Sequence, residues 1–215
     1  MGSVDRPIGE RGGSGKPIIG LMGGPGSGKS HLAGLMRDMG AGVIDADALA
    51  RASLNEPAVR DQLVAWWGGD VLTAGGGVDR AAVGRRVFDA PEALARLESV
   101  VHPRVSAQRR ALRTAYQKDS AVLAVVEDCP LLLEQGLDAG CDRLVFVDAP
   151  RAVRQQRVER GRGWTTAELD RREKNQAGLD IKRARADYIF DSTADPGTAK
   201  SEARRLLDEI LATHR

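Results

Sequence analysis

Residues 23–30 of this 215-residue chain read GGPGSGKS and give the clearest indication of its fold. It matches the pattern G-x-x-x-x-G-K-[ST], in which glycines let the backbone turn its N–H groups toward a phosphate. An apolar run at residues 18–22 predicts a buried strand before it, and apolar residues at helical spacing follow from Leu32 to Met39. A strand, a glycine-rich loop and a helix in this order predict a nucleotide-binding loop. The residues expected to contact the nucleotide are Gly24, Pro25, Gly26, Ser27, Gly28, Lys29 and Ser30.

Two side chains of this loop carry chemistry. Lys29 is expected to reach the β- and γ-phosphates of ATP, and the Ser30 hydroxyl is expected to bind Mg²⁺. Pro25 contributes no backbone N–H to the loop. The loop therefore predicts ATP as co-substrate and Mg²⁺ as cofactor.

Further apolar runs alternate with helical patterns. They predict strands at residues 42–45, 121–126, 144–147 and 188–190. Strands that alternate with helices indicate parallel βαβ units, hence an α/β fold of three layers with a five-stranded parallel sheet and helices on both faces. Residues 48–120 break this rhythm, with helical patterns at 91–101 and 103–116 and no convincing strand. We interpret them as a helical insertion that binds the second substrate.

Residues 1–16 have too little apolar content to offset the entropy of ordering and are predicted to be a disordered tail before a single domain at 17–215. GSGK at residues 13–16 imitates a phosphate loop. Pro17 follows it where a hydroxyl is required, so we do not expect it to bind a nucleotide.

Acidic residues follow two of the predicted strands. Asp45 and Asp47 stand at the end of the second predicted strand, where period-two alternation places both carboxylates on one side, toward the phosphate loop. One could accept the proton of the acceptor hydroxyl and the other could hold Mg²⁺ through water; alternatively, they cap a helix that starts near Ala48. Asp128, after the next strand, is either a metal ligand or part of a turn before Pro130.

Arginine is concentrated between residues 151 and 185, which hold nine Arg and two Lys against five acids. Arg154, Arg157, Arg160 and Arg162 are interleaved with glycines, which suits a lid at about residues 154–177 that closes over ATP. The alternative is a solvated basic helix, because Arg outnumbers Lys 26 to 6 over the whole chain. His102 precedes Pro103, and a turn between two helices is expected there.

Composition excludes several classes of protein. A net charge of +2 gives no global field for nucleic acid, and no apolar run approaches the roughly 20 residues of a membrane span. Two cysteines form neither a disulfide framework nor a zinc spacing, so a cytoplasmic location is expected.

A P-loop GTPase would need an Asn-Lys-x-Asp motif, which is absent, and Lys29, Ser30 and the paired aspartates argue against a silent binding module.

From Ile18 to Thr193 the chain resembles the dephospho-coenzyme A kinase family. The similar blocks, in order, are residues 20–30, 43–51, 78–80, 87–88, 97–103, 130–134, 176 and 186–189. The resemblance implies transfer of the γ-phosphate of ATP to the 3′-hydroxyl of the ribose of dephospho-coenzyme A, by a monomer or small homo-oligomer. The fold it implies is a five-stranded parallel core, a helical lobe for the coenzyme substrate and a small lid.

The resemblance also implies roles for single residues. Asp47 matches the family's proposed base, Arg51 and His102 match positions near the acceptor, and Arg160 matches the lid arginine near the adenine and phosphates. The chain departs from the family pattern at Asp191-Ser192, where the family tends to show Asn, and at His31, where Thr is frequent. Another small-metabolite or nucleoside kinase would share every feature on the ATP side and remains the alternative.

Overall fold

A computed structural model describes residues 15–88 and 90–214. It divides into two compact units. The first comprises the described residues up to Asp45 together with those from Arg113 onward, and the second is Ala46–Leu112. The predicted tail at residues 1–16 lies mostly outside the described residues. Lys16 is described, and its Nζ donates a 2.8 Å hydrogen bond to the carbonyl of Tyr116.

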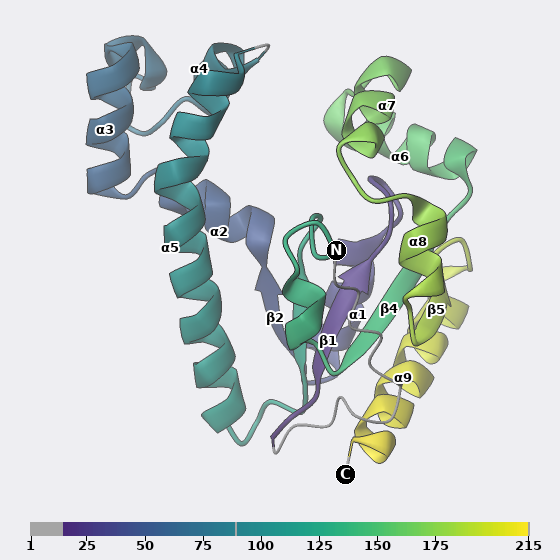
Figure 1. Cartoon of the computed structure of the whole chain (residues 1–215). Helices are drawn as coiled ribbons and strands as arrows, with labels where there is room; N and C mark the ends of the chain where they lie inside the picture. The colour runs from purple at the N-terminus through teal and green to yellow at the C-terminus, as the bar shows by residue number, and fades with distance from the viewer. Residues whose placement is uncertain (1–14, 89, 215) are drawn as a thin grey trace, which may run out of the picture. The chain divides into compact units, whose positions relative to one another are not determined.

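The first unit is built on a five-stranded parallel sheet, as the alternating pattern predicts (Figure 1). The strand order is β2-β3-β1-β4-β5, so the strand before the phosphate loop is central. The strands are β1 (Ile18–Met22), β2 (Gly42–Asp45), β3 (Val125–Asp128), β4 (Arg143–Asp148) and β5 (Tyr188–Asp191).

Helices cover both faces of this sheet. On one face α1 and α9 bury the main core with Ile19, Leu21 and Val126. On the other face, Arg113 near the end of α5 pairs with Glu127 of β3, and Arg183 of α8 lies over the Phe146 ring of β4. The bounds in this unit are α1 (Lys29–Asp38), η2 (Leu137–Gly140), α6 (Arg151–Arg162), α7 (Thr166–Lys174), α8 (Leu179–Ala184) and α9 (Pro196–Thr213), while α5 (Pro91–Lys118) begins in the second unit.

The second unit is helical and has its own core. Val59, Leu63, Val71, Val83 and Val101 are buried together in it. Its elements, besides the first part of α5, are α2 (Ala46–Ser53), α3 (Pro57–Trp67), η1 (Gly69–Val71) and α4 (Arg80–Val87). That this unit binds the second substrate stays a prediction.

Two sequence predictions about local structure are wrong. The third strand begins at Val125 rather than 121, because Asp119 closes a turn by accepting the backbone N–H groups of Ala121 and Val122. His102 and Pro103 lie inside the continuous helix α5 instead of in a turn.

The continuity of α5 has a packing explanation. Pro103 removes the hydrogen bond to the carbonyl four residues earlier, and its ring crowds that carbonyl, so other contacts must offset the cost. Downstream of the proline, Arg104 and Gln108 both hydrogen-bond Glu56, at 3.1 and 2.7 Å. These contacts, together with burial of Val101, hold the helix together on both sides of the proline.

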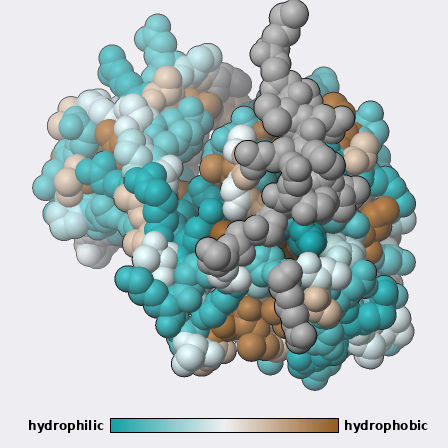
Figure 2. All heavy atoms as spheres, turned by 60° about the horizontal axis from the view of Figure 1, so that its bottom comes forward, coloured by the Kyte–Doolittle hydropathy of each residue, from teal (hydrophilic) through white to brown (hydrophobic). Residues whose placement is uncertain are grey.

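Hydrophilic residues predominate on the face turned to the viewer in Figure 2, with a few separate hydrophobic areas. The exposed large hydrophobic residues among those described are scattered along the chain: Phe88, Leu94, Leu123, Ile181 and Ile189. None of the helices formed by the described residues is long and apolar enough to cross a membrane.

Candidate functional site

The phosphate loop joins β1 to α1, where the sequence pattern places it. The Ser27 N–H donates to the Gly24 carbonyl at 3.1 Å, and Gly28 caps α1 with φ at 101°. Gly26, at φ 76°, would bring a Cβ within 2.6 Å of the Arg154 carbonyl oxygen. Both positions therefore require glycine, and the loop lies at the positive end of α1, which favours an anion.

The side chain of Lys29 folds back over this loop. Its Nζ donates to the carbonyls of Gly23 and Gly24 at 2.9 and 3.0 Å, and the residue is 9% exposed. The ammonium is thus held beside the loop by ordinary hydrogen bonds that a phosphate could replace.

Ser30 and Asp128 are brought together at the carboxyl ends of the strands. The Ser30 Oγ donates a 2.7 Å hydrogen bond to Asp128 Oδ2. Asp128 ends β3, and its register partner on β2 is Asp45. One hydroxyl and two carboxylates therefore belong to this edge, and all are hard oxygen donors of the kind that Mg²⁺ prefers.

Asp47 does not share the strand with Asp45. β2 ends at Asp45, and Asp47 lies exposed in the first turn of α2. The predicted period-two alternation of the two carboxylates is therefore wrong, because pleating stops where the helix begins. Arg51 lies in the last turn of α2 and His102 lies in α5, and both are exposed residues of the second unit.

The arginine-rich segment forms the helices α6, α7 and α8, and a short connection joins the first two. α6 ends at Arg162 and is capped by Gly163, which has φ 65°, and Thr165 caps α7 by accepting the Glu168 N–H. Between them, the Trp164 ring is flanked by the guanidinium groups of Arg162 and Arg172, at 4.8 and 4.2 Å from its centroid. Cation–π contacts of this kind stabilise the connection.

Acidic residues of α7 tie it to α6. Glu173 accepts from Arg151 at 2.8 Å and also pairs with Arg154. Asp170 hydrogen-bonds Arg151, and this contact, with the nearby negative charges, raises the pKa of the Arg151 guanidinium. Ion pairs therefore join the first residues of α6 to the last residues of α7.

Two arginines of α6 contact the phosphate loop. Arg154 is 4% exposed, and its Nη1 lies 2.8 Å from where a Cβ on Gly24 would stand. Arg157 donates through Nη1 to the Ser27 carbonyl at 3.1 Å. Arg160, the predicted lid arginine, is exposed and makes no hydrogen bond or ion pair with the residues that the structure describes.

A cavity of about 370 Å³ adjoins the loop. Arg157 reaches across its wall to Ser192, donating to the Ser192 Oγ at 2.8 Å and to its carbonyl at 2.6 Å. Beside it, hydrogen bonds from Thr193 hold the pKa of Asp191 below its usual value. The lining residues are Gly28, His31, Arg157, Ser192, Ala194 and Pro196.

Sequence reasoning singled out Arg160 and missed the contacts of Arg154, Arg157 and Ser192. A signal was present in the spacing, because Arg154 and Val158 stand four residues apart and are both buried. An arginine on the buried side of a helix needs an internal partner. The choice of partner depends on residues far away in the chain.

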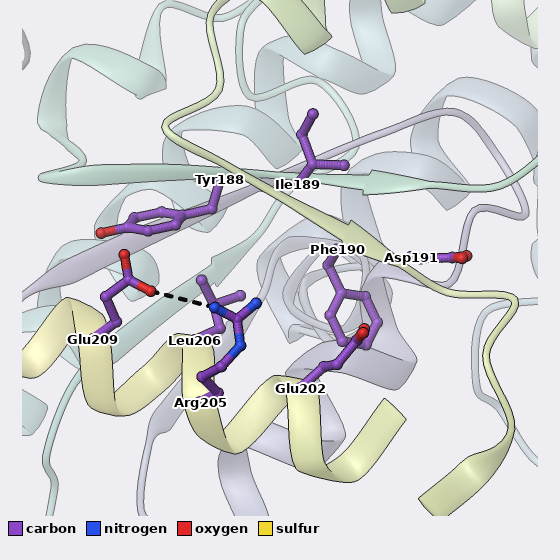
Figure 3. Close-up of a pocket in the computed structure, with 8 residues that line it drawn as sticks. All are labelled: Tyr188, Ile189, Phe190, Asp191, Glu202, Arg205, Leu206 and Glu209. Carbon is purple, nitrogen blue, oxygen red and sulfur yellow. Dashed lines mark ion pairs between the residues drawn. The ribbon is translucent and has the colours of Figure 1, made fainter. Parts of the chain in front are cut away.

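A second pocket lies between β5 and α9, away from the phosphate loop in sequence (Figure 3). Asp191, Glu202 and Glu209 contribute carboxylates to it, and Arg205 is its one guanidinium. Arg205 is paired with Glu209 at 3.7 Å, the contact drawn as a dashed line. Three carboxylates against one paired arginine disfavour a phosphate ligand.

The parallel sheet, the phosphate loop after its central strand and the Ser30–Asp128 pair define a nucleotide-binding protein of the P-loop class. The sequence profile of the family described as dephospho-CoA kinase matches residues 17–196. The chain therefore belongs to the dephospho-CoA kinase family, whose members are ATP-dependent kinases.

Individual relatives agree with this assignment. The chain is 41% identical over 201 residues to the dephospho-CoA kinase of Anaeromyxobacter dehalogenans, covering 90% of this chain and 92% of the relative. It is 39% identical to that of Deinococcus radiodurans, covering 81% and 83%. Among solved structures, the protein TT1252 of Thermus thermophilus superposes with a TM-score of 0.73 at 34% identity, covering 93% of this chain and 98% of that one. The dephospho-CoA kinase of Campylobacter jejuni shares the fold, with a TM-score of 0.66 at 20% identity and coverage of 92% and 98%.

Proposed function

We propose that this protein transfers the γ-phosphoryl group of ATP to the 3′-hydroxyl of the ribose of dephospho-CoA, giving CoA and ADP. The match of the family profile to residues 17–196 carries this proposal. An intact phosphate loop, with Lys29 and Ser30 in place, supports it from the side of the nucleotide.

On the ATP side, the loop N–H groups bind the phosphates and Lys29 neutralises charge on the transferring group. Its present partners are the Gly23 and Gly24 carbonyls, which it can exchange for phosphate oxygens. Such an electrostatic donor acts most strongly where charge spreads in the transition state. The nucleoside occupies the cavity beside Gly28, whose volume of about 370 Å³ falls in the range of small-molecule sites.

The donor set at the strand ends fits Mg²⁺. Ser30 and Asp128 would hold the ion, and Asp45, the register partner of Asp128, would hold it through water. When bound, the ion would supply positive charge that offsets the negative charge of the phosphates. A site with few carboxylates suits Mg²⁺, which completes its coordination with waters and substrate phosphates.

On the acceptor side, Asp47 orients the ribose hydroxyl and accepts its proton. Asp47 is exposed in the first turn of α2, two positions after β2 ends, which leaves its carboxylate accessible to a substrate. Arg51 and His102 bind the rest of dephospho-CoA. These three roles rest on the family resemblance.

The lid arginines act on the phosphates. Arg154 and Arg157 lie next to the phosphate loop, which supports a role for both in binding ATP. Arg160 lies exposed in the last turn of α6, and its role near ATP rests on the family resemblance. We assign it to the closed state of the lid. A cytoplasmic location and a monomer or small homo-oligomer complete the proposal.

The test uses the purified protein with ATP, Mg²⁺ and a set of acceptors. ADP release should be far faster with dephospho-CoA than with adenosine, a nucleoside monophosphate, shikimate or gluconate. A 3′-deoxy analogue of dephospho-CoA should give no phosphorylated product, and the 2′-deoxy analogue should still react. Faster turnover of another acceptor would overturn the substrate, and reaction of the 3′-deoxy analogue would overturn the position of transfer.

A further inference from the structure

Lys182 is a buried charge that the proposed reaction does not use. It lies in α8 with 2% of its surface exposed. Its Nζ donates to Gln176 Oε1 at 2.9 Å and lies 3.1 Å from Glu134 Oε1. A buried ammonium is costly unless it is paired and hydrogen-bonded, so this arrangement calls for an explanation.

Glu134 also accepts a hydrogen bond from the backbone next to Gln176. The same Oε1 accepts the backbone N–H of Ala177 at 2.7 Å. Gln176 and Ala177 belong to the connection between α7 and α8. We call this connection together with α8, residues 175–184, the return leg, because it leads from the proposed lid back to the sheet. One carboxylate oxygen therefore fixes the return leg both through its backbone and through Lys182.

The turn that carries Glu134 is hydrogen-bonded and packed against the sheet. Glu134 lies in a turn in which the Gln135 N–H donates to the Leu131 carbonyl at 3.0 Å. Leu132 in this turn is 2% exposed and packs beneath β1, where its Cδ2 would lie 2.7 Å from a Cβ on Gly20. Glu134 is thus attached to the central strand that leads into the phosphate loop.

The return leg that Lys182 fixes reaches the phosphate loop itself. Leu179, three residues earlier in α8, has its Cδ2 3.3 Å from where a Cβ on Gly24 would stand. Residues three apart share one face of a helix, so fixing Lys182 also fixes Leu179. Arg154 approaches the same glycine from α6. Side chains of α6 and of α8, the helices at the two ends of the proposed lid, therefore both lie next to Gly24.

We propose that Lys182 is a positioning residue for phosphoryl transfer. Together with Glu134 and Gln176 it forms a lid anchor, which holds Leu179 over the phosphate loop and so excludes water from the γ-phosphate. The inference deepens the proposed function and rests on it. An apolar side chain could give α8 equal stability, but only directional bonds to Gln176 and Glu134 fix its position along the return leg.

The experiment compares Lys182→Met, which keeps the length of the side chain but removes the charge, with Lys200→Met on the exposed surface of α9. Two rates are measured on the full chain: ADP release with the acceptor, and ADP release without it. Lys182→Met should lower kcat/KM for ATP by about 10- to 100-fold, the cost of a misplaced catalytic group. It should also raise the fraction of ATP hydrolysed by water, while Lys200→Met changes neither.

Two further variants separate positioning from stability. Glu134→Gln keeps an acceptor for the Ala177 N–H but removes the charge that faces Lys182, and it should shift the hydrolysis fraction in the same direction. Lys182→Arg should restore part of the loss. A lower melting temperature with unchanged kcat, KM and hydrolysis fraction in Lys182→Met and Glu134→Gln would overturn the inference.

If Lys182→Met does not fold, Glu134→Gln decides the question by the same readout. Failure of the proposed function has a different signature, because it concerns the wild type. The wild-type protein would then prefer another acceptor, and the hydrolysis fraction is measured with that acceptor instead.

Discussion

The Ser30 hydroxyl donates a 2.7 Å hydrogen bond to Asp128, 98 positions away in the chain. Ser30 is the second residue of α1, the helix after the phosphate loop, and Asp128 ends the strand beside β1. The bond links the loop to the strand edge and leaves both groups arranged as a pair of oxygen ligands. The hydroxyl and the carboxylate of the proposed metal site therefore lie next to each other.

Asp128→Asn should raise the Mg²⁺ concentration needed for half-maximal activity by about tenfold or more, as expected when a group at a metal site is lost. The amide keeps the shape of the side chain but loses the charge. Mg²⁺ titrations of the steady-state rate measure the shift. Asp38→Asn, at the exposed end of α1, serves as the matched control. An unchanged Mg²⁺ dependence in Asp128→Asn would leave the metal site without this ligand.

Lys29→Ala should reduce turnover about a hundredfold or more, the usual cost of losing one strong electrostatic donor. The loss should appear in kcat at saturating ATP, because Lys29 stabilises the transition state more than the ground state. Lys16→Ala, in the GSGK sequence at residues 13–16 that imitates a phosphate loop, is the control. Lys16 bonds backbone carbonyls near the end of α5, so its loss should lower stability slightly and leave kcat unchanged. Equal kinetic damage from both changes would refute the assignment of the loop.

Asp47→Asn should lower the single-turnover rate by roughly 10²- to 10⁴-fold, the range for a positioned general base. A loose transition state for phosphoryl transfer favours the lower end. Asp45→Asn should act through Mg²⁺ instead, so added Mg²⁺ should restore part of its loss. If metal rescues Asp47→Asn and not Asp45→Asn, the two roles must be exchanged.

Arg157→Ala should raise the KM for ATP by about tenfold, because loss of one charge-assisted bond costs on the order of 1.5 kcal/mol or more. Arg157 contacts both the loop and the cavity wall, so its loss affects binding of the nucleotide. Arg160→Ala should slow turnover more than it raises KM, because Arg160 is assigned to the closed lid. Arg171→Ala, on α7, is expected to do little to either.

Steady-state kinetics over a range of ATP concentrations compare the three lid variants. A larger effect of Arg171→Ala than of Arg157→Ala would place the contact with ATP elsewhere in the arginine-rich segment. An Arg160→Ala enzyme with wild-type turnover would remove Arg160 from the proposed mechanism.

The local parts of the fold were predictable from the sequence. β1, the phosphate loop and the start of α1 follow from a continuous stretch whose glycines and apolar residues act on their neighbours. The bounds of β2 also match the prediction. Local steric preferences and periodicity suffice to predict these elements, although β1 is paired in the structure with the distant strands β3 and β4.

Contacts between residues that are far apart in the chain could not be predicted from the sequence. Arg157 bonds Ser27 across 130 positions and Ser192 across 35, and no local pattern specifies those partners. The preference of the residue before a proline predicted a turn at His102, but tertiary contacts of α5 outweighed it. Asp47 was assigned to a strand because the helix was expected to begin two residues later than it does.

Trp164, whose ring lies next to the guanidinium groups of Arg162 and Arg172, would provide an optical reporter of the proposed lid motion. Trp66 and Trp67, the other two tryptophans of the chain, both lie in α3 of the second unit. Replacing these two by phenylalanine leaves Trp164 as the sole indole fluorophore. Arg162 belongs to α6 and Arg172 to α7, so a rearrangement of these helices should change the surroundings of the ring and hence its emission intensity. Stopped-flow mixing with ATP would then time the movement of the lid without an attached dye.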